Sequence, residues 1–215
     1  MISINDPAVL AAFLTGVAGP VIVQIIQNYN KDKAASKKDR LAEEITFSAQ
    51  IEGKLDEIKD TLKADRVWIT HFHNGGHYYP TGVSIQKFSR FYEVVNHNID
   101  STKLTYQNIP VSLFSKSNNQ ILDNNILSIS DFKDETIATY GLKHIAEEDG
   151  TKSLYMVGIR DFNDKLIGIL GVEYVKRKNQ LEDKDINYIE LEATSIGGVL
   201  STYFQIKHLN NGKIS

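Results

Sequence analysis

The chain contains no cysteine among its 215 residues. This absence excludes disulfide bonds, cysteine nucleophiles, zinc knuckles and thioether-linked cofactors, and it is compatible with a reducing compartment. Only four prolines are present, which argues against long disordered stretches. Neither sign of charge dominates, because the formal net charge is −3. The composition therefore gives no support to nucleic acid or an acidic substrate as a partner.

Common catalytic motifs are also absent. The sequence has no G-x-S-x-G elbow, no P-loop and no H-E-x-x-H helix, so we expect a protein that is not an enzyme. The acidic run Glu147-Glu148-Asp149 is interpreted as a solvated loop.

Residues 1–30 form a hydrophobic segment of the transmembrane type. The run from Ala8 to Ile26 holds 19 residues without a charge, and as a helix it would span about 28 Å, close to the thickness of a bilayer core. Five basic residues follow it: Lys31, Lys33, Lys37, Lys38 and Arg40. This asymmetry predicts a single span in the inner or plasma membrane, with the C-terminal domain in the cytoplasm. The alternative is a helix buried between subunits of a larger assembly.

Residues 31–63 predict a basic, amphipathic helical linker. Its seam residues are spaced close to a heptad repeat: Leu41, Ile45, Ser48, Glu52, Leu55 and Leu62. Such a seam favours a coiled-coil homodimer. The two polar seam positions weaken it, and the open alternative is a helix that packs on the domain that follows.

Residues 64–207 predict an α+β domain, an antiparallel sheet flanked by N- and C-terminal helices, with a polar tail at 208–215. Strands are expected at 65–72 and 88–95, and the first is expected to break at Asn74-Gly75-Gly76. Residues 153–160 and 165–174 read as a hairpin around an Asn/Asp turn. A long amphipathic helix is expected from 182 to about 204.

The last third of this domain is similar to the C-terminal half of GAF domains. The matching positions are Ser153, Asp164, Gly168, Leu170, Gly171 and the pair Leu181 and Asp185. The resemblance extends over residues 64–204 and implies a GAF-like fold with a sensing, dimerising or partner-binding role. It departs from the cyclic-nucleotide-binding members at Leu181 and Ile186, and from the bilin-attaching members in having no cysteine. It therefore names no ligand and no cofactor.

Candidate site residues cluster at the end of the first predicted strand. Three imidazoles can hold a divalent metal, and His71, His73 and His77 are the candidates. The second hypothesis is a small-molecule pocket with aromatic walls and a few polar groups. Its predicted residues are His71, His73, Asn74, Gly75, Gly76, Tyr78, Tyr79, Arg90 and Tyr92. The plainer alternative is that these residues complete a strand, a turn and the core.

The sequence thus predicts a membrane-tethered, dimeric, GAF-like sensory module that binds a small molecule or a protein partner without catalysis. Two alternatives stay open: a structural or interaction subunit of a larger assembly, such as a viral one, and a metal-dependent enzyme built on the three histidines.

Overall fold

The computed structural model describes residues 19–134 and 141–212, with side-chain surroundings for 41–134 and 141–205. By packing, the chain divides into residues 1–49 and residues 50–215. The second unit holds the sheet, and everything below concerns this unit unless stated otherwise.

Six antiparallel strands form one sheet in the order β3-β2-β1-β6-β5-β4. The strands are β1 (Arg66–His77), β2 (Ser84–Val95), β3 (Ile109–Pro110), β4 (Ile126–Ile129), β5 (Ser153–Arg160) and β6 (Leu166–Tyr174). The predicted hairpin is confirmed as β5 and β6. Asp164 stands in its turn with a φ of 61°, a left-handed conformation that aspartate tolerates better than most residues.

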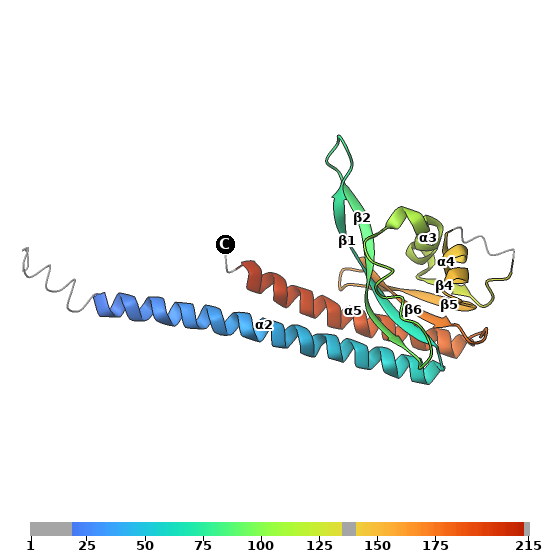
Figure 1. The fold of residues 1–215 in the computed structure, drawn as a ribbon, viewed down its shortest axis with the longest axis horizontal. Coiled ribbons are helices and arrows are strands. Elements are labelled where there is room, and N and C mark those ends of the chain that lie inside the picture. The colour runs from blue at the N-terminus through green and yellow to red at the C-terminus, as the bar shows by residue number, and fades with distance from the viewer. Residues whose placement is uncertain (1–18, 135–140, 213–215) are drawn as a thin grey trace, which may run out of the picture. The chain divides into compact units, whose positions relative to one another are not determined.

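Helices cover both faces of the sheet (Figure 1). They are α2 (Gly19–Leu62), the 3₁₀ turn η2 (Val111–Phe114), α3 (Ser115–Asn124), α4 (Leu142–Glu148) and α5 (Asp183–Gly212). Helices α3 and α4 lie on one face, and α5 lies on the other with the last turns of α2. The α+β layout with flanking terminal helices is therefore as the sequence predicts.

The last turns of α2 belong to the core of the domain. Ile51, Leu55 and Ile58 are at most 1% exposed, whereas Leu41 and Ile45, earlier in the same helix, are more than 60% exposed. Their burial favours the packed amphipathic helix for the C-terminal part of the linker. The coiled coil and the homodimer stay predictions.

Helix α5 comes close to the sheet because of a glycine. A Cβ on Gly197 would lie 2.3 Å from the carbonyl oxygen of Arg160 at the end of β5. Since no side chain fits there, any larger residue would push the helix away from the strand.

The expected break of the first strand at Asn74-Gly75-Gly76 is wrong. Strand β1 continues to His77, which pairs with Ser84 of β2 across a register shift. The two strands extend together past the rest of the sheet as a two-stranded arm (Figure 1). The register shift falls between Asn74 and His77, and Gly76 has a φ of 87° there, a conformation that glycine adopts without strain.

Most of the predicted membrane segment, residues 8–18, lies outside the described residues. Over the described part of the chain, no helix combines the length and the apolar character needed to cross a membrane.

His71 lies on the α5 face of the sheet in an aromatic cluster. Its ring centroid is 5.3 Å from that of Phe91, 6.2 Å from that of Tyr92 and 5.7 Å from that of Phe204 on α5. Burial lowers the pKa of His71 to about 4, against a smaller opposing effect of a hydrogen bond to the backbone of Ile167. The imidazole is thus a neutral part of the core at pH 7.

The lowered pKa of His71 predicts that the protein loses stability in mild acid. The unfolded chain binds the proton near pH 6.5 and the folded chain only near pH 4, so the free energy of unfolding should fall between these values, by about 3 kcal/mol in all. Urea denaturation at pH 7, 5.5 and 4 measures it. His71→Phe should flatten this part of the profile, and His144→Gln, at an exposed position on α4, controls for the loss of a histidine. Equal profiles for the wild type and His71→Phe would contradict the assignment.

Candidate ligand-binding site

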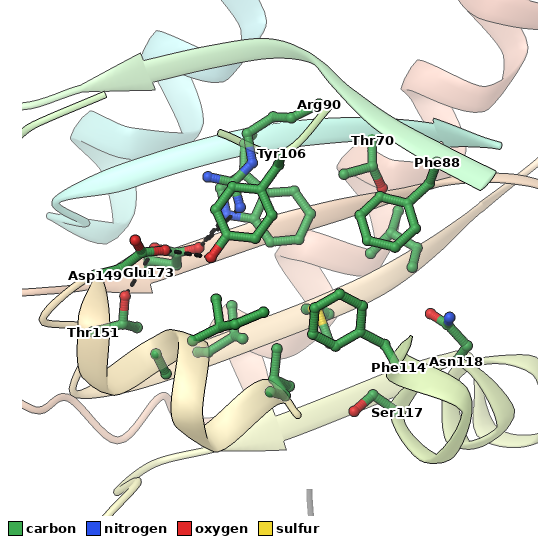
Figure 2. A pocket seen from close by; sticks show the side chains of 17 residues that line it. Thr70, Phe88, Arg90, Tyr106, Phe114, Ser117, Asn118, Asp149, Thr151 and Glu173 are labelled. Atoms are coloured by element: carbon green, nitrogen blue, oxygen red, sulfur yellow. Dashed lines mark hydrogen bonds and ion pairs between the residues drawn. The ribbon is translucent and has the colours of Figure 1, made fainter. Parts of the chain in front are cut away.

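A cavity lies between the sheet and the helices α3 and α4 (Figure 2). Its volume is about 50 Å³. This is room for roughly three or four water molecules, or for a small organic group. The lining side chains are Trp68, Thr70, Phe88, Arg90, Tyr106, Phe114, Ser117, Asn118, Leu142, Ile145, Ala146, Asp149, Thr151, Leu154, Met156, Ile169 and Glu173.

The middle of the cavity is apolar. Phe88 of β2 faces Phe114 of η2, with ring centroids 5.6 Å apart. Leu154 and Met156 project from β5, and Ala146 faces them from α4. Apolar walls with a few polar groups are typical of small-molecule sites.

One end of the cavity rests on a buried network of charges. Arg66 of β1, Arg90 and Glu93 of β2, and Glu173 of β6 have side chains between 1% and 6% exposed. Arg90 contacts Glu93 at 2.9 Å and Glu173 at 3.4 Å, and Arg66 forms an ion pair with Glu173. Two positive charges thus meet two negative charges, the balance that buried ions require.

Hydrogen bonds from neutral groups support the two glutamates of this network, whereas the Nε of each arginine is buried without a hydrogen-bond partner. Thr102 donates to Glu93 at 2.8 Å and Thr151 donates to Glu173 at 3.0 Å. Burial pushes the pKa of Glu93 up, but hydrogen bonds from Ser101 and Thr102 and the charge of Arg90 together hold it below its usual value. Glu93 is therefore ionised at neutral pH.

Strand register brings these groups to one face of the sheet. Arg66 lies opposite Glu173, and two residues on, Trp68 lies opposite Gly171. A Cβ on Gly171 would lie 2.2 Å from the Trp68 ring, so the glycine leaves the indole room to lie flat on β6 and donate its N–H to Glu173. The Arg90 guanidinium then stacks 4.3 Å from both the Trp68 and the Tyr106 rings. This sandwich adds cation–π attraction to the ion pairs.

Asp149 stands at the same end, just after α4. The hydroxyl of Tyr106 donates a hydrogen bond to its carboxylate. Burial, with a further contribution from the charge of Glu173, raises the pKa of Asp149 above its usual value. Burial, and then the bond to Asp149, also raises the pKa of Tyr106. The interpretation of the acidic run as a solvated loop is therefore wrong: Glu147 and Glu148 are exposed but end the helix α4, and Asp149 is half-buried at the cavity.

The opposite end of the cavity carries two hydroxyl groups without partners. Thr70 of β1 and Ser117 of α3 are 3% and 1% exposed, and neither hydroxyl oxygen has a hydrogen-bond partner. Figure 2 shows Thr70 next to Phe88, and Ser117 next to Phe114, on the side away from Asp149. Buried polar groups are rarely left unsatisfied, so these hydroxyls need an explanation.

Of the nine residues predicted for a pocket, the structure brings only Arg90 to the cavity. His71 and Tyr92 lie on the other face of the sheet, against Phe204. The rest lie on the arm formed by β1 and β2 or at its tip: His73, Asn74, Gly75, Gly76, Tyr78 and Tyr79. Of these, Tyr79 is 97% exposed.

The three histidines do not form a metal site. The imidazole of His73 lies 2.9 Å from the hydroxyl of Ser89, whereas His71 is buried against aromatic rings and His77 is exposed on the arm. No group of three His, Cys, Asp or Glu side chains suited to a metal ion occurs in the described ranges. Strand alternation brings His71 and His73 near each other along the chain, but no further ligand joins them.

Trp68 and Glu173 were not predicted as site residues, and Asp149 was interpreted as part of a solvated loop. The sequence did contain one sign that Glu173 has a buried partner. Glu173 is the single charge inside the apolar strand β6, and a charge in such a strand must be paired. Nothing in the sequence indicated that its partners come from positions 66 and 90, because pairing across three strands depends on the register.

No model of a known protein family and no curated protein sequence matches the chain. Solved structures do. The photoproduct state of GAF3 from Slr1393 of Synechocystis sp. PCC6803 is 14% identical, covers 76% of this chain and 98% of its own, and superposes with a TM-score of 0.61. The GAF domain of PixJ from Thermosynechococcus elongatus, in its blue-light absorbing form, is 16% identical over 80% and 95%, with a TM-score of 0.61.

A third similar structure is the phycocyanobilin-bound GAF domain from a cyanobacterial phytochrome. It is 16% identical over 77% of this chain and 90% of its own, with a TM-score of 0.58. At these identities the likeness defines the fold and no activity. The chain therefore has the GAF fold, as its C-terminal third predicts.

The charge network predicts a large effect of Glu173→Gln. This change keeps the volume but leaves two buried arginines with a single buried glutamate, and breaking a buried ion pair in this way costs about 3–5 kcal/mol. Urea denaturation followed by circular dichroism measures the free energy of unfolding. Glu182→Gln, at an exposed position before α5, is the control and should be unchanged. A loss below about 1 kcal/mol for Glu173→Gln would show that the arginines find other partners.

Proposed function

We propose that this chain is a non-catalytic sensory module that binds a small molecule in the cavity between the sheet and the helices α3 and α4. The observation that carries the proposal is the arrangement of the cavity: apolar in the middle, with polar groups at both ends. Ligand sites combine these two features, because apolar walls supply affinity and a few polar groups fix orientation.

The likeness to other proteins supports this use of the fold. One similar GAF domain was solved with phycocyanobilin bound, so the fold holds a small molecule in at least one protein. The present chain has no cysteine to which a ligand could be joined by a thioether bond, and we therefore propose reversible binding.

The position of the cavity suits a sensor. Its wall includes Trp68 and Thr70 of β1, and their neighbours Ile69 and His71 are buried and point to the opposite face. Alternate residues of one strand thus contact the ligand and the core under α5. A ligand that shifts β1 therefore acts on both faces.

The proposal predicts that filling the cavity abolishes binding. Ala146 of α4 lines the cavity, and Ala146→Leu places three more carbon atoms in it. Native mass spectrometry of the purified full-length chain, and a thermal-shift screen of metabolites, identify the ligand. At a hundredfold excess over its Kd, a ligand should raise the Tm by about 5–10 °C, and the variant should lose this rise.

Ala193→Leu is the matched control, because Ala193 of α5 is equally buried but lies outside the cavity. It should lose stability from overpacking while keeping the ligand-induced rise. Binding that survives in Ala146→Leu would place the ligand elsewhere, and a screen without any binder would count against a small-molecule sensor.

Residues 8–26 supply the second part of the proposal, a membrane tether with the GAF-fold domain on the cytoplasmic side. The support is the uncharged run followed by the basic cluster at 31–40. Deleting residues 8–26 should move the protein from the membrane pellet to the supernatant after fractionation. Deleting the polar tail, 208–215, should change nothing. Sedimentation of the first variant with membranes would contradict the tether.

A further inference from the structure

The charged end of the cavity has one carboxylate more than its arginines neutralise. Arg66 and Arg90 are matched by Glu93 and Glu173, with which they form ion pairs. Asp149 is the fifth charged group, and it takes part in no ion pair among the described residues. When all five groups are ionised, this end of the cavity carries one net negative charge.

Asp149 is also short of hydrogen bonds. Within the described part of the chain, the Tyr106 hydroxyl is the single group that donates to it. A carboxylate has room for about four such bonds, and its raised pKa reflects the cost of an ionised group that burial leaves poorly compensated. A positive group beside Asp149 would remove this cost.

The arginines serve that purpose only in part, because their charges lower the pKa of Asp149 by less than burial raises it. The guanidinium of Arg90 is fixed between the rings of Trp68 and Tyr106, with its terminal nitrogens bound to Glu93, Thr102 and Glu173. An anionic ligand would have to displace a buried glutamate from these terminal nitrogens, since the one nitrogen of the Arg90 guanidinium without a hydrogen-bond partner is its buried Nε. A cation needs no such displacement.

The far end of the cavity points independently to a ligand. The hydroxyls of Thr70 and Ser117 are buried, line the cavity and have no partner. Between the two ends lie the aromatic and aliphatic walls, and Figure 2 shows Asp149 and Ser117 at opposite ends of this row. A molecule with an apolar body thus has a polar group to meet at each end.

We infer that the ligand is a small amine, with its ammonium group against the carboxylate of Asp149 and its apolar body between Phe88, Phe114 and Met156. The inference rests on the proposed function, that the cavity binds a small molecule, and adds the chemical class. The cavity volume of about 50 Å³ limits the ligand to a compact molecule.

Three probes of one shape separate charge from size: benzylamine, benzyl alcohol and benzoate. Calorimetric titration of the full-length chain at pH 7, where the amine is protonated, gives each Kd. Benzylamine should bind at least tenfold more tightly than the alcohol, which is about 1.4 kcal/mol, and benzoate should bind most weakly. This comparison uses the wild-type chain, so it does not depend on the folding of any variant.

Asp149→Asn then tests the residue. It keeps an acceptor for the Tyr106 hydroxyl while removing the charge. Benzylamine should lose at least tenfold in affinity, and the affinity for benzyl alcohol should change less than threefold. Asp164→Asn is the matched control, because this aspartate is exposed in the β5–β6 turn at a positive φ that asparagine also adopts. It should leave all three affinities unchanged.

Failure of the inference and failure of the proposed function look different. If benzyl alcohol or benzoate binds as tightly as the amine, or if Asp149→Asn keeps the preference for the amine, the amine inference is wrong and the cavity remains a ligand site. The amine inference is also wrong, and the cavity also remains a ligand site, if none of the three probes binds but a screen finds another ligand whose binding Ala146→Leu abolishes. If the screen also finds none, the proposed function itself is wrong.

Discussion

A balanced set of buried charges is the constraint on which the sheet depends. Arg66, Arg90, Glu93 and Glu173 come from three adjacent strands, and their ion pairs form only when β2, β1 and β6 pair in one register. A slip of one residue would turn these side chains to the other face and leave charges unpaired in the core. Ion pairs of this kind add little net stability, but they penalise every other register.

The cavity follows from the same constraint. Because Gly171 lets Trp68 lie flat, Arg90 is stacked between two rings and becomes a fixed part of the cavity wall. Its terminal nitrogens are bound to Glu93, Thr102 and Glu173, and the charge of Asp149 is only partly compensated, so that its pKa stays raised. The buried ion pairs therefore determine the charge that a ligand beside Asp149 should carry, although the ligand does not need to contact these ion pairs.

Sequence patterns predicted the elements better than the site. The hairpin 153–174 and the helix after 182 followed from alternation, turn residues and helical periodicity, which are local properties. The site prediction chose the His71–Tyr79 string because its composition is unusual. That string continues into an exposed arm, since the pairing of β1 with β2 shifts its register at Asn74-Gly75-Gly76 and resumes at His77. Local composition gave no information about this pairing.

By itself the sequence determined the α+β class, the order of most elements and the absence of cysteine chemistry, because these depend on neighbours along the chain. Tertiary structure alone decided that Glu173 meets Arg66 and Arg90, that His71 faces α5, and that Asp149 borders a cavity. The contact of Arg66 with Glu173 joins residues 107 positions apart. Such contacts depend on strand register and helix packing, which no local pattern specifies.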